Sequence, residues 1–137
     1  MSMKKNTTKG SWEILKPALY VQLIQLALTL VWNIAGVILI SRGLRALGPV
    51  ASLAVAAIAL VFGIVLVVSL RRWPVLYGVF SVVIGLMAIW SVVNAFTANP
   101  ALWPSDFWRY AGAAVNVIGI VGFVMAVVGL VKWKKMY

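Results

Sequence analysis

Four long apolar segments restrict what this chain can fold into. We place them at residues Pro17–Ser41, Pro49–Leu70, Pro74–Phe96 and Phe107–Val131. Each is long enough to cross the hydrocarbon core of a bilayer, which takes about 20 apolar residues in helical form. Lipid offers no hydrogen-bond partner to an open strand edge, so helices are the expected structure. The sequence therefore predicts an all-α integral membrane protein with four transmembrane helices.

The links between these segments are short. Residues 42–48 join the first pair, residues 71–73 join the second and third segments, and residues 97–106 join the last pair. Short links make consecutive helices adjacent and opposite in direction. The sequence therefore predicts an antiparallel up-down bundle that forms a single domain over residues 17–137.

The first 16 residues are more polar than the rest of the chain. Ser11 is followed by Trp12 and Glu13, and a serine in this position can accept a hydrogen bond from the first backbone N–H groups of a helix. We therefore expect residues 1–16 to be a basic cytoplasmic tail that contains a short interfacial helix.

Charged residues are scarce, at 10% of the chain, whereas 64% of the residues are hydrophobic. The two acids are Glu13 and Asp106, and the sequence has no histidine and no cysteine. Imidazole and thiolate chemistry are therefore excluded, and two carboxylates on opposite sides of a membrane cannot act as an acid–base pair. Proton-coupled transport needs an ionisable residue within the membrane, and the apolar segments carry only Arg109, in a first turn. We expect no enzymatic activity, no cofactor and no metal site.

Basic residues are unevenly divided between the two sides of the predicted bundle. Nine belong to the side with both termini and the link 71–73: Lys4, Lys5, Lys9, Lys16, Arg71, Arg72, Lys132, Lys134 and Lys135. The other side carries three, Arg42, Arg45 and Arg109. Because basic residues are enriched on the cytoplasmic side, we expect a multi-pass protein of the plasma (inner) membrane with both termini in the cytoplasm. The basic clusters would attract anionic lipid head groups on the inner face.

The second half of the chain resembles the first at a nearly constant offset. The pattern Pro-x-Leu-Tyr begins at Pro17 and again at Pro74, 57 positions later, and Trp32 and Trp90 follow at an offset of 58. A fixed offset indicates two duplicated helical hairpins, arranged as parallel repeats. Chance matching between segments of similar apolar composition is the alternative.

One face of the first helix is polar. It carries Gln22, Gln25, Thr29 and Asn33, and Asn116 lies on the last helix. Polar groups that remain unpaired in an apolar medium are costly, so we expect these side chains to form an interhelical hydrogen-bonded seam. A polar path or binding site lined by the same residues is the alternative.

Small residues line one face of the last helix. Gly112, Gly119 and Ala126 recur every seven residues, and Gly122 and Gly129 do the same on an interleaved row. Small residues let helices approach closely in lipid, so this face predicts a helix-packing interface within the bundle or between copies of the chain. A substrate groove along the same face is the alternative.

The longest link combines prolines with aromatic residues. Trp103, Asp106, Trp108 and Arg109 lie in it or directly after it, and Asp106 and Arg109 are spaced to pair within one helical turn. An aromatic anchor at the membrane interface is one interpretation. An outer surface that binds a partner is the other.

These features favour a small non-enzymatic membrane protein that acts through helix–helix packing. It would be an accessory or structural subunit of a membrane complex, or a self-associating unit. Its partners would be lipids, other membrane protein subunits or copies of itself, and not nucleic acid, because its basic residues come without a stacking platform. The alternatives are a homo-oligomeric channel or uncoupled small-solute carrier lined by the first helix, and a membrane immunity protein that binds its target through residues 97–110.

Overall fold

The computed structural model describes the backbone of residues 2–136 and the side chains of residues 10–136. These residues form four α-helices, one short 3-10 helix and no strand. The elements are α1 (Ser2–Ser41), α2 (Leu53–Arg72), α3 (Pro74–Thr97), η1 (Pro100–Leu102) and α4 (Asp106–Met136). Each α-helix contains a stretch that is long and apolar enough to span a membrane. The all-helical prediction is confirmed, and the chain has the character of a multi-pass membrane protein.

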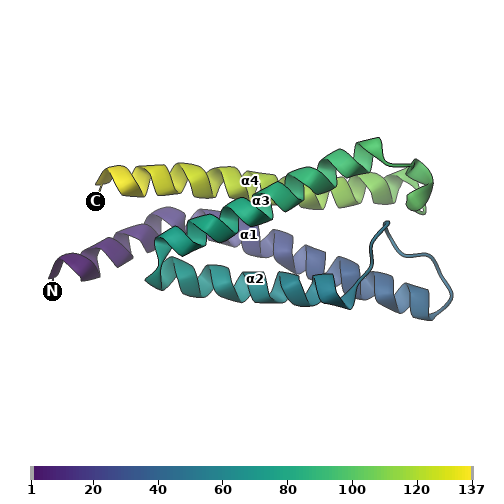
Figure 1. Cartoon of the computed structure of the whole chain (residues 1–137), viewed down its shortest axis with the longest axis horizontal. Helices are drawn as coiled ribbons and strands as arrows, with labels where there is room; N and C mark the ends of the chain where they lie inside the picture. Colours follow the sequence, from purple (N-terminus) through teal and green to yellow (C-terminus); the bar gives the residue numbers. More distant parts are fainter. Residues whose placement is uncertain (1, 137) are drawn as a thin grey trace.

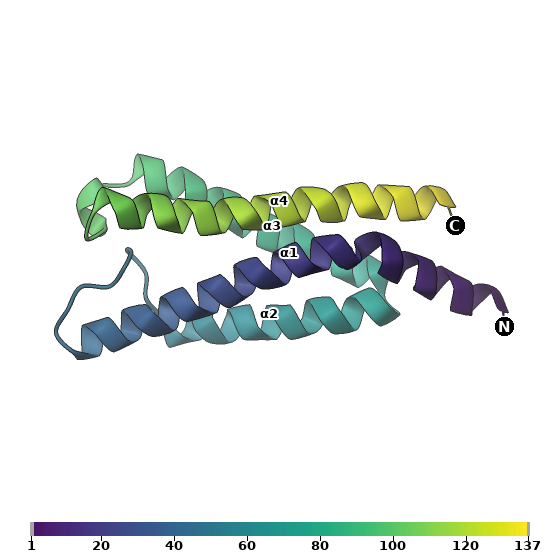
Figure 2. The same ribbon diagram turned by 180° about the vertical axis from the view of Figure 1, so that it is seen from behind.

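The helices lie side by side around a common core. Helix α1 packs against both α2 and α4, and α3 packs against α4 and, less extensively, against α2. Both chain ends lie at one end of the molecule, together with the link between α2 and α3 (Figures 1 and 2). The two longer connections, residues 42–52 and 98–105, lie at the opposite end, which we call the loop end.

Helix α1 is longer at its N-terminus than the sequence indicates. It runs without interruption through Pro17, and Ser11 is buried inside it. The expectation of a separate interfacial helix capped by Ser11 is therefore wrong. Leu15 and Leu19 are fully buried and continue the core along α1, so tertiary packing favours a continuous helix over a break at Pro17. The side chains of Lys4, Lys5 and Lys9, which contribute to the predicted orientation, lie outside the described residues.

Helix α2 begins later than the sequence indicates. The second segment was expected to open at Pro49, but residues 49–51 are not helical and Ser52 is the N-cap. The Ser52 hydroxyl accepts from the backbone N–H groups of Ala54 and Val55, at 3.1 and 3.4 Å. A serine that satisfies these otherwise unpaired donors decides where the helix starts more strongly than a proline does.

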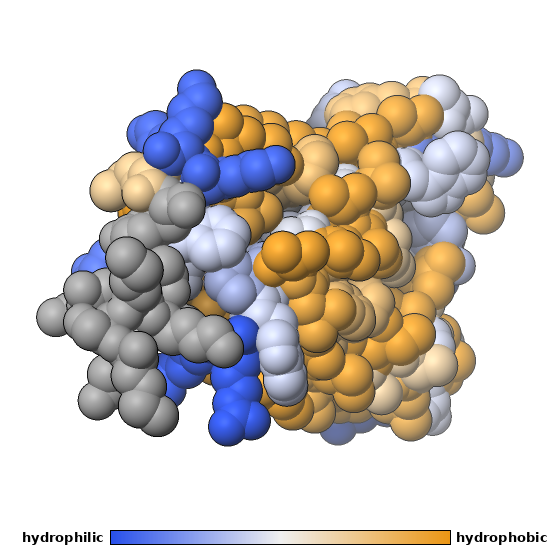
Figure 3. Space-filling view, turned by 60° about the vertical axis from the view of Figure 1, so that its left-hand side comes forward, coloured by the Kyte–Doolittle hydropathy of each residue, from blue (hydrophilic) through white to orange (hydrophobic). Residues whose placement is uncertain are grey.

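The outer surface of the helices is apolar. Large side chains such as Ile24, Leu60, Val68 and Val124 are exposed along it. Figure 3 shows this apolar surface extending along the helices, with hydrophilic side chains toward both ends of the molecule. A surface of this kind matches a lipid environment, because a water-soluble protein rarely exposes such large apolar areas.

The matched positions of the two halves occupy different environments. Tyr20 is 50% exposed, whereas its counterpart Tyr77 is fully buried. Pro17 lies inside α1, but Pro74 is the first residue of α3. The duplication stays a prediction, and the two hairpins differ structurally at the positions that suggest it.

Close approach of α3 and α4 depends on Gly85. A Cβ atom at this position would lie 2.3 Å from Cγ of Phe123, whereas one at Gly63 would meet Leu23 at 3.6 Å and Leu26 at 4.0 Å, both ordinary contacts. We expect Gly85→Ala to lower the free energy of unfolding by about 1–3 kcal/mol, because the helices must move apart to admit the methyl group. Gly63→Ala is the matched control and should be neutral or stabilising, since alanine is the better helix former. Unfolding in mixed micelles, followed by circular dichroism, measures both, and equal effects would contradict this packing.

Candidate functional site

A buried polar cluster joins α1 to α3 across the bundle. The Gln22 Nε2 atom donates to the Ser81 hydroxyl at 2.9 Å, and the Tyr77 hydroxyl donates to Gln22 Oε1 at 2.5 Å. All three side chains are fully buried. Both ends of the Gln22 amide are therefore satisfied inside the chain, and the cluster holds the two helices at a fixed depth relative to each other.

Gln25 and Thr29 form hydrogen bonds within α1. Gln25 Nε2 donates to the Thr29 hydroxyl at 3.1 Å, and that hydroxyl donates to the backbone carbonyl of Gln25 at 2.9 Å. Gln25 Oε1 is buried and accepts no hydrogen bond from the described residues. Gln25 therefore lies on the predicted polar face but, unlike Gln22, forms no side-chain hydrogen bond to another helix.

The two asparagines lie nearer the loop end. Asn33 Nδ2 donates to the carbonyl of Thr29 at 2.9 Å, and Asn33 Oδ1 accepts from the backbone N–H of Ser52 at 3.1 Å. Asn33 thus ties the start of α2 to α1. Asn116 Nδ2 donates to the carbonyl of Gly112 at 2.9 Å, within α4. The predicted polar set is therefore divided between the bundle core and the loop end.

The small-residue face of α4 lies against α1 of the same chain. A Cβ atom at Gly119 would lie 2.9 Å from Cγ of Gln25, and one at Gly122 would lie 2.8 Å from Cγ of Gln22. Gly129 similarly meets Leu15, at 2.6 Å, and Gly112 meets Trp32, at 3.4 Å, while Ala126 is fully buried. The structure places this face inside the bundle, where it receives the larger side chains of α1.

The predicted outer surface is only partly exposed. Asp106 and Arg109 pair at 3.0 Å, and the Asp106 side chain is 70% exposed. Trp108 packs edge-on against Trp32, with the ring centroids 5.9 Å apart. Trp103 is only 6% exposed, so including it in an exposed partner surface was wrong. Trp103 is buried because the connections at the loop end fold back over the helix ends, where it packs with Ala95 and Ala113.

A cavity of about 320 Å³ lies at the loop end. Residues of all four α-helices and of both connections at the loop end line it. Its polar lining consists of Thr29, Asn33, Ser91, Asn94, Arg109 and Asn116, and its aromatic lining of Trp32, Trp90 and Trp103. Three residues of the predicted polar set, Thr29, Asn33 and Asn116, thus share one cavity. Sequence reasoning missed the contribution of α3, although Asn94 is a polar residue within an apolar segment and could have indicated it.

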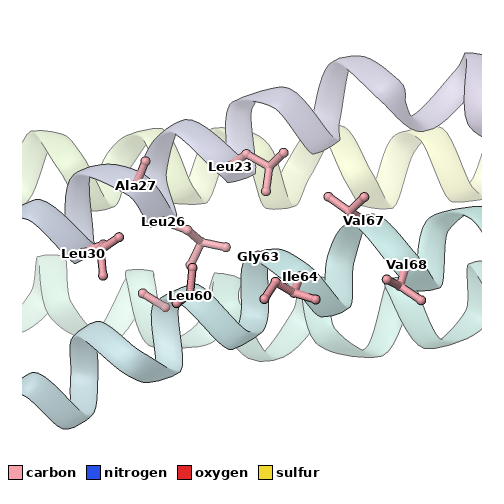
Figure 4. A pocket seen from close by; sticks show the side chains of 10 residues that line it. Leu23, Leu26, Ala27, Leu30, Leu60, Gly63, Ile64, Val67 and Val68 are labelled. Carbon is pink, nitrogen blue, oxygen red and sulfur yellow. The ribbon is translucent and has the colours of Figure 1, made fainter.

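A second hollow of about 380 Å³ is an apolar groove between α1 and α2 (Figure 4). The groove lining comprises Leu23, Leu26, Ala27, Leu30, Ala59, Leu60, Gly63, Ile64, Val67 and Val68. The small residues Ala27, Ala59 and Gly63 create the hollow between the larger side chains. The groove opens on the apolar outer surface, since Leu60, Ile64 and Val68 are exposed.

Comparison with protein-family models, with curated proteins and with solved structures gave no match. A function for the chain therefore has to follow from its own features. These are the polar cluster, the packed glycine face, the cavity at the loop end and the apolar groove.

The polar cluster leads to a test of its structural role. Tyr77→Phe leaves Gln22 Oε1 buried without its hydrogen-bond donor, and we expect the free energy of unfolding to fall by about 1 kcal/mol. Tyr20→Phe, at the matching position of the first half, should have almost no effect, because Tyr20 is exposed. Unfolding in mixed micelles compares the two variants with the wild type. A loss of stability in Tyr20→Phe as large as in Tyr77→Phe would contradict the assignment.

Proposed function

We propose that the chain is a non-enzymatic integral membrane protein that acts as an accessory or structural subunit, by lateral contact with a transmembrane helix of another membrane protein. The apolar groove between α1 and α2 is the observation that carries this proposal. Its small residues Ala27, Ala59 and Gly63 are of the kind that let helices approach closely in lipid. The groove extends from Ala59 to Val68 on α2, which is about 14 Å of helix at 1.5 Å per residue. This is enough for roughly two turns of a partner helix.

Lateral contact has more support than conduction through the first helix. A channel or carrier lined by that helix would need Gln22 and Gln25 to face an open path. Gln22 is fully buried and hydrogen-bonded to Ser81 and Tyr77, and Gln25 is buried beside Gly119. Gln22 is therefore used in holding the bundle together, and Gln25 packs against α4 rather than facing an open path.

In the membrane, we propose that the four helices form an antiparallel up-down bundle with both termini in the cytoplasm. The short links and the excess of basic residues near the termini support this placement. Arg71, beside the Trp12 ring at 4.7 Å, and Lys134 and Lys135 would lie at the inner surface of the plasma membrane. There they would contact anionic lipid head groups.

The proposal is tested by filling the groove. Ala27 is exposed on the groove wall, so Ala27→Phe should occupy the hollow without disturbing the core. We expect this variant to reduce recovery of the complex with the partner about tenfold, which corresponds to about 1.4 kcal/mol. Native mass spectrometry of the gently extracted protein measures the fraction in complex. Ala57→Phe is the matched control, because Ala57 is exposed on α2 but does not line the groove.

Three outcomes are informative. Loss of a complex of discrete mass in Ala27→Phe, with the complex retained in Ala57→Phe, supports the proposal. A complex that contains only copies of this chain shifts the function to self-association through the same groove. A protein that is monomeric before any substitution and carries only lipid adducts overturns the proposal, because the groove would then hold acyl chains.

A further inference from the structure

The cavity at the loop end contains hydrogen-bond donors that the chain itself does not use. Arg109 lines this cavity, and its side chain is only 14% exposed. One terminal nitrogen of its guanidinium pairs with Asp106, but its Nε atom is buried and has no hydrogen-bond partner within the described residues. A guanidinium can only donate hydrogen bonds, so the group that completes this site must be an acceptor.

Two indole N–H groups lie close together at the same cavity. A Cβ atom on Gly48 would lie 3.3 Å from Nε1 of Trp103 and 3.6 Å from Nε1 of Trp32. Gly48 and both tryptophans line the cavity, and within the described part of the chain neither indole donates a hydrogen bond. Indole nitrogens are also donors only. The cavity therefore presents a positive charge and several donors, and no acidic side chain lines it.

The charges around the cavity also favour an anion. The described loop end carries Arg42, Arg45 and Arg109 against the single acid Asp106, a net charge of +3 − 1 = +2. Asp106 is mostly exposed, so solvent weakens its neutralisation of Arg109. Arg45 donates to the backbone carbonyl of Ala101 and so joins the two connections that close this end.

The cavity opens toward the lipid-facing surface. Trp90, Val50 and Met87 line it and are themselves largely exposed, with Trp90 at 70%. Tryptophans and an arginine near a helix end are typical of the depth of lipid head groups. A volume of about 320 Å³ is at the lower end for small-molecule sites and suits a head group better than a whole lipid.

We infer that this cavity binds a phosphate group, either that of an anionic amphiphile or a free phosphate. The phosphate oxygens accept hydrogen bonds from Arg109 Nε and from the indoles of Trp32 and Trp103, and the apolar part leaves beside Trp90. The same phosphate chemistry has two sources, the head group of a bilayer lipid and a free phosphate in the adjoining water. The site lies within one chain and is therefore independent of the proposed partner contact in the groove.

The test measures lipid binding by the purified full-length protein in a neutral detergent. Native mass spectrometry compares the binding of phosphatidylglycerol and phosphatidylcholine to the wild type and to three variants. Arg109→Gln should weaken phosphatidylglycerol binding about tenfold, the effect of one charge-assisted hydrogen bond. Trp103→Phe keeps an aromatic ring but removes an indole donor, and should weaken binding about threefold.

Arg42→Gln is the matched control. It removes the same charge from an exposed residue at the same end that does not line the cavity, and should change binding less than twofold.

A second arm separates the two sources of phosphate. Inorganic phosphate at millimolar concentration is added to the wild type with bound phosphatidylglycerol. Retention of the lipid assigns the site to a head group, and displacement that Arg109→Gln abolishes assigns it to free phosphate. Both results support a phosphate site.

Thermal unfolding of each variant shows whether the fold is retained. Equal effects of Arg109→Gln and Arg42→Gln would overturn the inference, since binding would then reflect general surface charge. Equal wild-type affinities for the two lipids, together with no effect of inorganic phosphate, would also overturn it.

Discussion

The contact between α1 and the glycine face of α4 is the constraint on which the rest of the structure depends. Gly119 and Gly122 leave room for the side chains of Gln25 and Gln22, which could not lie at this depth beside any larger residue. With Gln22 held there, its amide reaches Ser81 and Tyr77 on α3. A row of small residues thus allows a polar cluster in the interior, and that cluster fixes a third helix.

The polar residues of the structure are of two kinds: those whose side chains are hydrogen-bonded within the bundle, and those that line the cavity at the loop end. In the bundle core, Gln22 is fully paired and stabilises the fold, as expected where lipid cannot replace a missing hydrogen bond. At the loop end, Arg109 Nε has no hydrogen-bond partner within the described residues, and the indole nitrogens of Trp32 and Trp103 lie at the same cavity. Groups that are already paired contribute to stability, whereas unpaired donors near the surface are available to a ligand. The loop end is therefore the more promising place for specific binding, and the apolar groove for lateral contact.

Several parts of the fold and of the candidate site were predictable from the sequence. The four helices follow from the lengths of the apolar segments, and the pairing of Asp106 with Arg109 follows from their spacing. The start of α2 directly after Ser52, the continuity of α1 through Pro17 and the burial of Trp103 were not predicted. Each of these depends on contacts with residues distant in the sequence or on competition between two local signals. The cavity was missed as a unit because all four α-helices and both connections at the loop end contribute to it.

By itself, the sequence determined that the chain is helical and suited to a membrane, because a helix satisfies its own backbone and its transfer into lipid depends on its own residues. Only the tertiary structure decided which polar groups are used up inside the bundle. It placed the glycine face of α4 against α1, paired Gln22 with Tyr77, and left Arg109 with an unpaired donor at a cavity. These outcomes depend on how each helix is rotated and how the helices cross. Rotation and crossing follow from packing between residues far apart in the sequence, which no local pattern specifies.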